Sequence, residues 1–293
     1  MLRNFVLRSL LIGVVSLVGL EVVPATEPVR KDMEYARIGE RVLALDLYHP
    51  TETTGPAPVV VWVHGGAWRS GSKNDVPVKR WVEQGFAIAS VDYRLSPEAP
   101  FPAQVHDIKA AIRFLQSKSA ELRIDPQKVV TAGSSAGGHL AALVGVSNGV
   151  AELEGDIGVP AATPARVGAI VSFFGASNLE SILSQSTPHG LSVRVPALKL
   201  LIGGTPDEKP DLAKLASPVA HVDAGDPPLW LVHGDADPQM PIEQSKELAT
   251  KYELLQLPVK FETIPSGKHG GKEFFEDQRL DRLAGELKQA IAK

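Results

Sequence analysis

Apolar runs and helix-like stretches alternate along most of the chain. Two short segments at 35–38 and 42–48 flank Gly39-Glu40, which predicts a β-hairpin. Further strands are predicted at the apolar segments 59–63, 86–91, 128–132, 167–174, 229–232 and 259–264. The continuous apolar run Val59 to Val63 is typical of a strand that is buried on both faces.

Helix-like patterns lie between these strands. They cover residues 76–84, 102–118, 136–147, 242–256 and 272–292. Buried strands that alternate with helices indicate an α/β fold with a parallel sheet covered by helices on both faces. We therefore expect one domain over residues 26–293, with a mostly parallel central sheet and an N-terminal antiparallel hairpin.

The N-terminal segment has the pattern of a targeting signal, and we do not expect it to be part of the folded domain. Arg3 and Arg8 precede an apolar stretch from Leu10 to Leu20, and Val23-Pro24-Ala25 resembles a small-residue cleavage site. The stretch is shorter than the roughly 20 residues of a membrane span. We expect residues 1–25 to be a signal peptide cleaved after Ala25, so that the protein is periplasmic or secreted; the alternative is an uncleaved membrane anchor.

Composition excludes several classes of function. The 293 residues contain 44% hydrophobic side chains, a formal net charge of −4 and no cysteine. The absence of cysteine excludes disulfides, a cysteine nucleophile and thiolate metal sites. No clustered basic face is evident, so we expect no nucleic-acid partner, and we expect no stable membrane partner.

The segment Gly133-Ser134-Ser135-Ala136-Gly137 carries the strongest chemical signal. It joins a predicted strand to a predicted helix, which resembles the G-x-S-x-G nucleophile elbow of α/β hydrolases. Ser135 is the candidate nucleophile because it alone has glycine two positions before and two positions after it, whereas the neighbouring Ser134 does not.

A serine nucleophile needs a general base, and the base needs an orienting acid. In hydrolases with this elbow the three residues follow in the order Ser, Asp, His. Two loops at carboxyl ends of predicted strands supply candidates: 233–238, with Asp235 and Asp237, and 266–271, with His269. His233 with the two aspartates of its loop also permits a metal site, although a short loop does not aim all three at one ion.

The loop His64-Gly65-Gly66-Ala67-Trp68 follows the first buried strand. Adjacent glycines let the main chain approach a ligand closely, which suits the backbone donors that stabilise an oxyanion. We expect His64 to fix this loop by hydrogen bonding; proton transfer is the alternative. Trp68 is a candidate for substrate binding by stacking, with ordinary packing as its alternative.

Several motifs together carry a family resemblance over residues 30–275. H-G-G-A-W, D-Y-R-L-S-P at 92–97, F-P-A-Q at 101–104, G-S-S-A-G-G and H-G-D-A-D-P occur in this order. The chain resembles α/β-hydrolase esterases of the hormone-sensitive-lipase type and, more closely, the bacterial acetylesterase and feruloyl-esterase group. It departs from lipase-like relatives at Ala67, which stands where they often carry a third glycine, and in the loop around Asp237.

The resemblance implies roles for individual residues. The catalytic residues would be Ser135, Asp237 and His269, with Asp237 preferred to Asp235. The oxyanion donors would be the N–H groups of Gly66, Ala67 and Ala136. Salt bridges beneath the site are expected of three charged residues, Asp92, Arg94 and Asp107.

The implied activity is a cofactor-free serine carboxylic-ester hydrolase, without a metal, that acts on short-chain or carbohydrate-linked acetyl or feruloyl esters. Alternatives are a lipase-like enzyme for longer acyl chains, a serine peptidase of the prolyl-oligopeptidase type, and a non-catalytic binding protein. Phe173 and Phe174 would line the acyl side or pack in the core. The irregular segment 178–218 is expected to be an insertion over the active site; the alternative is a surface excursion.

Overall fold

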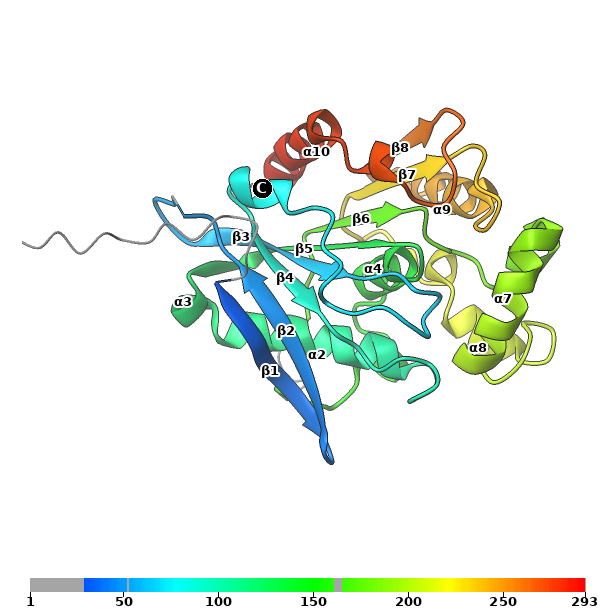
Figure 1. Ribbon diagram of the computed structural model, residues 1–293, viewed down its shortest axis with the longest axis horizontal. Coiled ribbons are helices and arrows are strands. Elements are labelled where there is room, and N and C mark those ends of the chain that lie inside the picture. Colours follow the sequence, from blue (N-terminus) through cyan, green and yellow to red (C-terminus); the bar gives the residue numbers. More distant parts are fainter. Residues whose placement is uncertain (1–28, 52, 161–164, 293) are drawn as a thin grey trace, which may run out of the picture.

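The computed structural model describes residues 29–51, 53–160 and 165–292. Its strands form one eight-stranded sheet in the order β1-β2-β4-β3-β5-β6-β7-β8 (Figure 1). The strands are β1 (Arg30–Ile38), β2 (Arg41–Tyr48), β3 (Ala57–Val63), β4 (Ala87–Val91), β5 (Ile124–Ser134), β6 (Ala169–Phe173), β7 (Leu229–Gly234) and β8 (Val259–Ile264). The predicted signal peptide lies outside the described residues and stays a prediction.

The sheet is mixed, as the sequence predicts. β2 pairs antiparallel with β1 and with β4, whereas every pair from β4 to β8 is parallel. The carboxyl ends of β3, β5, β6, β7 and β8 therefore meet along one edge, where ligands bind in open α/β sheets. All of the predicted catalytic residues follow strands that end there.

Helices cover both faces of the sheet. The main ones are α1 (Arg80–Glu83), α2 (Ala103–Ser117), α4 (Ala136–Val146), α7 (Pro188–Leu201), α9 (Ile242–Leu254) and α10 (Asp277–Ala290). Short elements are α3 (Ser119–Leu122), α5 (Ala151–Glu154), α6 (Ile182–Gln185), α8 (Pro210–Leu215), η1 (Pro218–Ala220) and η2 (Lys272–Phe274). None of the helices in the described ranges is both long and apolar enough to span a bilayer.

Two hydrophobic cores, one on each face, follow from the period-two alternation of the buried strands. On β3, Val61 packs in the core that includes α2, α4 and α9, whereas Trp62 packs in the core that includes α1 and α10. α1 and α10 contact each other on the second face (Figure 1).

Two predicted helices differ from the structure. The predicted helix 76–84 is reduced to α1, because Pro77 disfavours helical backbone at the residue before it. The predicted helix 272–292 is divided into η2 and α10, with Glu276 in extended conformation between them. Phe274, at the end of η2, is fully buried, and the next residue, Phe275, packs on Trp62. The burial of these two aromatic side chains therefore takes precedence over a continuous helix.

The irregular segment 178–218 contains α6, α7 and α8 and ends at the first residue of η1. In α7 it includes Val193, Arg194 and Ala197, which line the cavity at the carboxyl edge of the sheet. A helix therefore forms where the sequence shows little periodicity. Thr187 stabilises its start, because the Oγ1 atom accepts a hydrogen bond from the Gly190 N–H at 3.0 Å.

Candidate active site

Ser135 lies on the sharp turn between β5 and α4, with a backbone φ of 54° and ψ of −118°. A non-glycine residue in this region is strained, and such strain is common at functional sites. The flanking glycines are required because the turn is tightly packed. A Cβ on Gly133 would lie 2.4 Å from the Gly137 carbonyl oxygen, and one on Gly137 would lie 2.0 Å from the Val63 carbonyl oxygen.

Ser135, His269 and Asp237 come together at the carboxyl edge. The Ser135 Oγ lies 2.8 Å from His269 Nε2, and His269 Nδ1 lies 2.7 Å from Asp237 Oδ2. These contacts assign the imidazole tautomer: Nδ1 donates to the carboxylate, and Nε2 accepts from the hydroxyl. This is the geometry of a nucleophile, a base and an orienting acid. Ser134, the sequence alternative, makes no comparable contact within the described residues.

The structure distinguishes the two aspartates of the loop after β7. Asp235 is exposed and accepts a hydrogen bond from the Ser266 N–H at 2.6 Å. The Asp237 side chain is fully buried, and its Oδ1 accepts bonds from the N–H groups of Gln239 and Met240, both at 2.8 Å. Asp237, as the resemblance implies, is therefore the aspartate that reaches His269.

Electrostatics keep Asp237 ionised. Burial alone would raise the pKa of this carboxyl. Hydrogen bonds from His233, from His269 and from the Met240 N–H outweigh burial and hold the pKa well below its usual range. The carboxylate is therefore ionised near neutral pH and can accept a bond from His269.

His233 is a functional residue that the sequence reasoning did not assign. Its fully buried Nε2 lies 3.4 Å from Asp237 Oδ2 and 3.0 Å from the Met240 carbonyl oxygen, and Nδ1 lies 2.7 Å from Ser245 Oγ. Nε2 therefore carries the proton, and the ring supports the acid. Its spacing of four residues before Asp237 is the sequence signal that could have identified it.

The loop at residues 64–71, here called the glycine loop, borders the nucleophile. Gly66, Ala67 and Trp68 have φ values of 108°, 52° and 60°. A Cβ on Gly66 would lie 2.1 Å from the Ser70 carbonyl oxygen, so only glycine fits there. The N–H groups of Gly66, Ala67 and Ala136 have no backbone or side-chain partner among the residues that the structure describes, so they are available to a ligand.

His64 fixes the glycine loop, as expected. The ring is 1% exposed, its Nδ1 lies 2.8 Å from the Gly65 carbonyl oxygen, and it stacks on Tyr93 with ring centroids 4.4 Å apart. The Tyr93 hydroxyl donates to the His64 carbonyl oxygen at 3.0 Å. Burial lowers the pKa of His64, so the ring stays neutral.

Trp68 borders the cavity with a largely buried indole, and its stacking on a substrate stays a prediction. It belongs to the residues around the cavity, but its side chain is 2% exposed and its Nε1 donates to His139 Nδ1 at 3.0 Å. His139 in turn donates from Nε2 to the Ala216 carbonyl oxygen at 2.7 Å. The Trp68 side chain thus makes packing contacts of the kind given above as the alternative to stacking. These contacts link the glycine loop to the nucleophile helix α4.

His139 predicts an acid-sensitive stability. Burial lowers its pKa to about 4, although the bond to Ala216 opposes this shift. Between pH about 6.5 and about 4 the unfolded chain binds a proton that the folded chain does not, so stability falls as the pH falls. The loss attributable to His139 is about 3 kcal/mol over this window.

Urea unfolding of the wild type and of the His139→Asn variant at several pH values between 4.5 and 7.5 measures this effect. We expect the free energy of unfolding to depend less steeply on pH in the variant. Equal slopes in both proteins would contradict the assignment. His64 contributes with the same sign in both proteins, so the difference between the slopes isolates His139.

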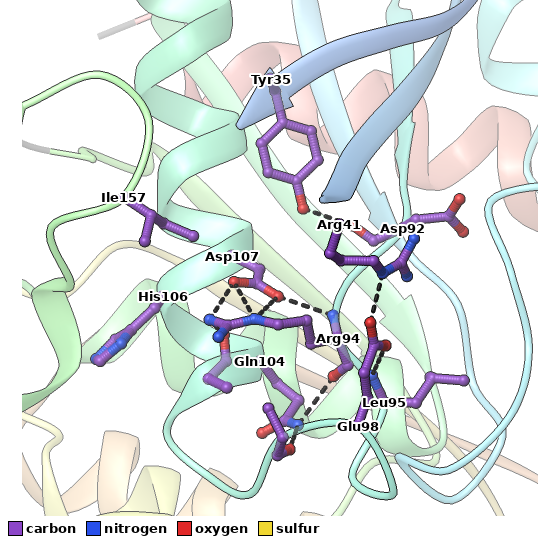
Figure 2. Close-up of polar contacts among 12 residues, drawn as sticks. Tyr35, Arg41, Asp92, Arg94, Leu95, Glu98, Gln104, His106, Asp107 and Ile157 are labelled. Carbon is purple, nitrogen blue, oxygen red and sulfur yellow. Dashed lines mark hydrogen bonds and ion pairs between the residues drawn. The ribbon is translucent and has the colours of Figure 1, made fainter. Parts of the chain in front are cut away.

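Polar contacts join the charged residues of the motif at 92–107 (Figure 2). Arg94 and the fully buried Asp107 form an ion pair with Nη2 and Oδ1 2.6 Å apart, and the Arg94 N–H donates to the same carboxylate at 2.8 Å. Asp92 instead accepts the Lys73 N–H at Oδ1, at 2.7 Å, and its carbonyl oxygen accepts the Tyr35 hydroxyl. Arg94 and Asp107 therefore form the expected salt bridge, whereas Asp92 makes hydrogen bonds, and the salt bridge expected of it is not found among the described residues.

A cavity of about 510 Å³ adjoins Ser135 and His269. Phe174 lines it at 4% exposure and meets the His269 ring edge-on at 5.0 Å, whereas Phe173 is fully buried in the core. Val193 and Ala197 of α7 add apolar surface. Polar surface comes from Arg69 and Ser70 of the glycine loop and from Asp75, which follows that loop. In the described ranges no three His, Cys, Asp or Glu side chains converge as metal ligands.

Comparison with known proteins agrees with this geometry. The BD-FAE family matches residues 45–252. Esterase LipC of Mycobacterium tuberculosis is 29% identical over 221 residues, which are 74% of this chain and 54% of that protein. The chain spans about half the length of the curated relatives that it matches first.

Solved structures give the same result. A truncated carbohydrate esterase from gut microbiota superposes with a TM-score of 0.83 at 31% identity, covering 92% of this chain and 99% of that one. An acetyl ester-xyloside bifunctional hydrolase from Caldicellulosiruptor lactoaceticus has a TM-score of 0.71 at 26% identity, covering 86% and 89% of the two chains. The chain therefore belongs to the BD-FAE family, among esterases built on the α/β-hydrolase fold.

Proposed function

We propose that the protein is a serine carboxylic-ester hydrolase that acts through an acyl-enzyme. The observation that carries this proposal is the row of contacts from Ser135 Oγ to His269 Nε2 at 2.8 Å and from His269 Nδ1 to Asp237 Oδ2 at 2.7 Å. The available N–H groups of Gly66, Ala67 and Ala136 beside this row support an oxyanion hole.

In the proposed mechanism Ser135 Oγ attacks the ester carbonyl carbon while His269 Nε2 takes the hydroxyl proton. Asp237 orients the imidazole and stabilises its cation. The tetrahedral intermediate then expels the alcohol, which receives the proton from His269. A water molecule, deprotonated by His269, attacks the acyl-enzyme, and its collapse releases the acid and restores Ser135.

We further propose short acyl esters, in particular acetyl or feruloyl groups linked to carbohydrate, as the substrate class. The printed descriptions of two structural relatives support this choice: a carbohydrate esterase and an acetyl ester-xyloside hydrolase. The cavity combines an apolar wall from α7 with polar residues of the glycine loop, which suits an acyl group on one side and a sugar on the other. Export before action on extracellular esters is part of the proposal and rests only on residues 1–25.

The experiment is hydrolysis of p-nitrophenyl esters from acetate to decanoate. We expect kcat/KM to be highest for acetate and to fall as the acyl chain lengthens, as the proposal of short acyl substrates requires. Acetylated xylan would be the next substrate. A preference for long chains would favour the lipase-like alternative. Turnover of a peptide amide at the rate of its ester analogue would favour a peptidase, and failure to react with a fluorophosphonate would favour a binding protein.

A further inference from the structure

Arg194 is a buried cation that the mechanism above does not use. It lies on α7 at 4% exposure, within the irregular segment of the sequence. Its Nη2 donates to the Gln239 carbonyl oxygen and its Nη1 contacts Met240 Sδ at 3.3 Å. The Nε atom is buried and has no hydrogen-bond partner within the part of the chain that the structure describes. Burying a guanidinium with an unpaired Nε costs desolvation free energy, so the burial of Arg194 calls for a functional explanation.

The partners of Arg194 belong to the loop that holds the acid. The same Gln239 that offers its carbonyl oxygen to Arg194 donates its N–H to Asp237 Oδ1 at 2.8 Å, and Met240 does likewise. Arg194 therefore holds the outer side of the two residues whose backbone orients the Asp237 carboxylate. The inner side of that carboxylate faces His269.

A second contact from the start of α7 acts on the same loop. The Thr187 Oγ1 donates to the Pro238 carbonyl oxygen at 2.7 Å. Gly190 lies so close that a Cβ on it would be 3.1 Å from the Gln239 carbonyl oxygen and 3.2 Å from that of Pro238. α7 thus contacts three consecutive residues, 238–240, of the loop that follows β7.

The positive charge of Arg194 also supports a role beside Asp237. Burial lowers the pKa of Arg194 to about 10, and the Asp237 carboxylate opposes this shift. The guanidinium therefore stays protonated near neutral pH. Its interaction with Asp237 favours the ionised carboxylate that the imidazolium needs during acylation.

We propose that Arg194 is a positioning residue for the triad, which acts through Gln239 and Met240 to keep Asp237 directed at His269. The inference rests on the proposed function. In this proposal α7 has two roles. Its apolar residues line the cavity, and Arg194 positions the Asp237 carboxylate. Removing Arg194, which is itself one of the residues around the cavity, should loosen the Asp237–His269 contact while leaving the apolar wall residues of α7 and the oxyanion donors in place.

The test compares Arg194→Met, Arg194→Lys and Thr187→Val with the wild type, using p-nitrophenyl acetate. We expect Arg194→Met to lower kcat about 100-fold with KM changed less than about threefold, since misplacing a catalytic group costs rate and not ground-state binding. Arg194→Lys, which keeps a charged donor, should recover part of the loss. Lys199→Met is the matched control: it removes an exposed charge from the same helix and should keep the wild-type kcat.

A double-mutant cycle with Asp237→Asn decides how Arg194 acts. If it acts through Asp237, Arg194→Met should lower kcat less than about threefold in the Asp237→Asn background, because the acid is already lost. A loss of the same size in both backgrounds, or a rise in KM alone, would overturn the inference and point to substrate contact. Thr187→Val is measured in the same double-mutant cycle with Asp237→Asn. It takes the place of Arg194→Met if that variant does not fold.

The failures of the two proposals are distinguishable. Retention of esterase activity by Ser135→Ala would reject the proposed nucleophile and acyl-enzyme mechanism, on which the role of Arg194 depends. Loss of activity in Ser135→Ala, together with wild-type kcat in both Arg194 variants, would reject only the role of Arg194.

Discussion

Replacing Ser135 with alanine should reduce kcat for ester hydrolysis by about 10⁵- to 10⁶-fold, because the variant lacks the attacking oxygen. Alanine retains a Cβ, so it is expected to occupy the strained turn with φ near 54° as serine does. The fold should therefore persist, with a thermal midpoint close to that of the wild type. Initial rates with p-nitrophenyl acetate, together with circular dichroism, measure both expectations.

Ser134→Ala is the matched control for this experiment. The two serines are adjacent, but only the Ser135 Oγ lies within hydrogen-bond distance of His269 Nε2. We expect Ser134→Ala to retain activity within about tenfold of the wild type, since it leaves the nucleophile, base and acid in place. The reverse result, with Ser134→Ala inactive and Ser135→Ala active, would reject the assigned nucleophile.

Replacing Asp237 with asparagine should lower kcat about 10⁴-fold. The fully buried carboxylate accepts a bond from His269 Nδ1 and fixes the tautomer in which Nε2 can accept a proton. The asparagine amide offers a donor as well as an acceptor, so it permits the opposite tautomer and cannot stabilise the imidazolium. The kcat for p-nitrophenyl acetate is the direct readout.

Asp235→Asn provides the comparison within the same loop. Asp235 is exposed, and its carboxylate accepts the Ser266 N–H away from His269, so we expect its replacement to change kcat by no more than a few fold. The two substitutions make the same chemical change two residues apart. A larger loss in Asp235→Asn than in Asp237→Asn would show that the wrong aspartate has been assigned.

The mostly parallel character of the sheet could be predicted largely because its central strands are apolar on both faces. Apolar runs such as Val59 to Val63 identify a central parallel strand without any knowledge of its neighbours. The nucleophile and the base were predictable for a related reason. Each follows a recognisable strand and lies among glycines, and the structure brings both to the same edge of the sheet.

Other features depend on contacts between distant parts of the chain. The Trp68 ring is buried because His139, 71 residues later, accepts its N–H. The contact of Arg194 with Gln239 joins residues 45 positions apart, and nothing in the irregular segment around Arg194 signals a partner. The choice between Asp235 and Asp237 likewise depended on which carboxylate the loop turns inward, which the residues alone left open.

The contacts of α7 with residues 238–240 bear on how this scaffold can be re-engineered. Exchanging the segment 178–218 for that of another esterase is an obvious way to reshape the cavity, since Val193 and Ala197 lie in its wall. Such a chimera would also lose the Arg194 and Thr187 contacts to the loop after β7. Grafts should therefore exchange segments 178–218 and 235–240 together, so that changing the specificity does not also misalign the carboxylate of Asp237.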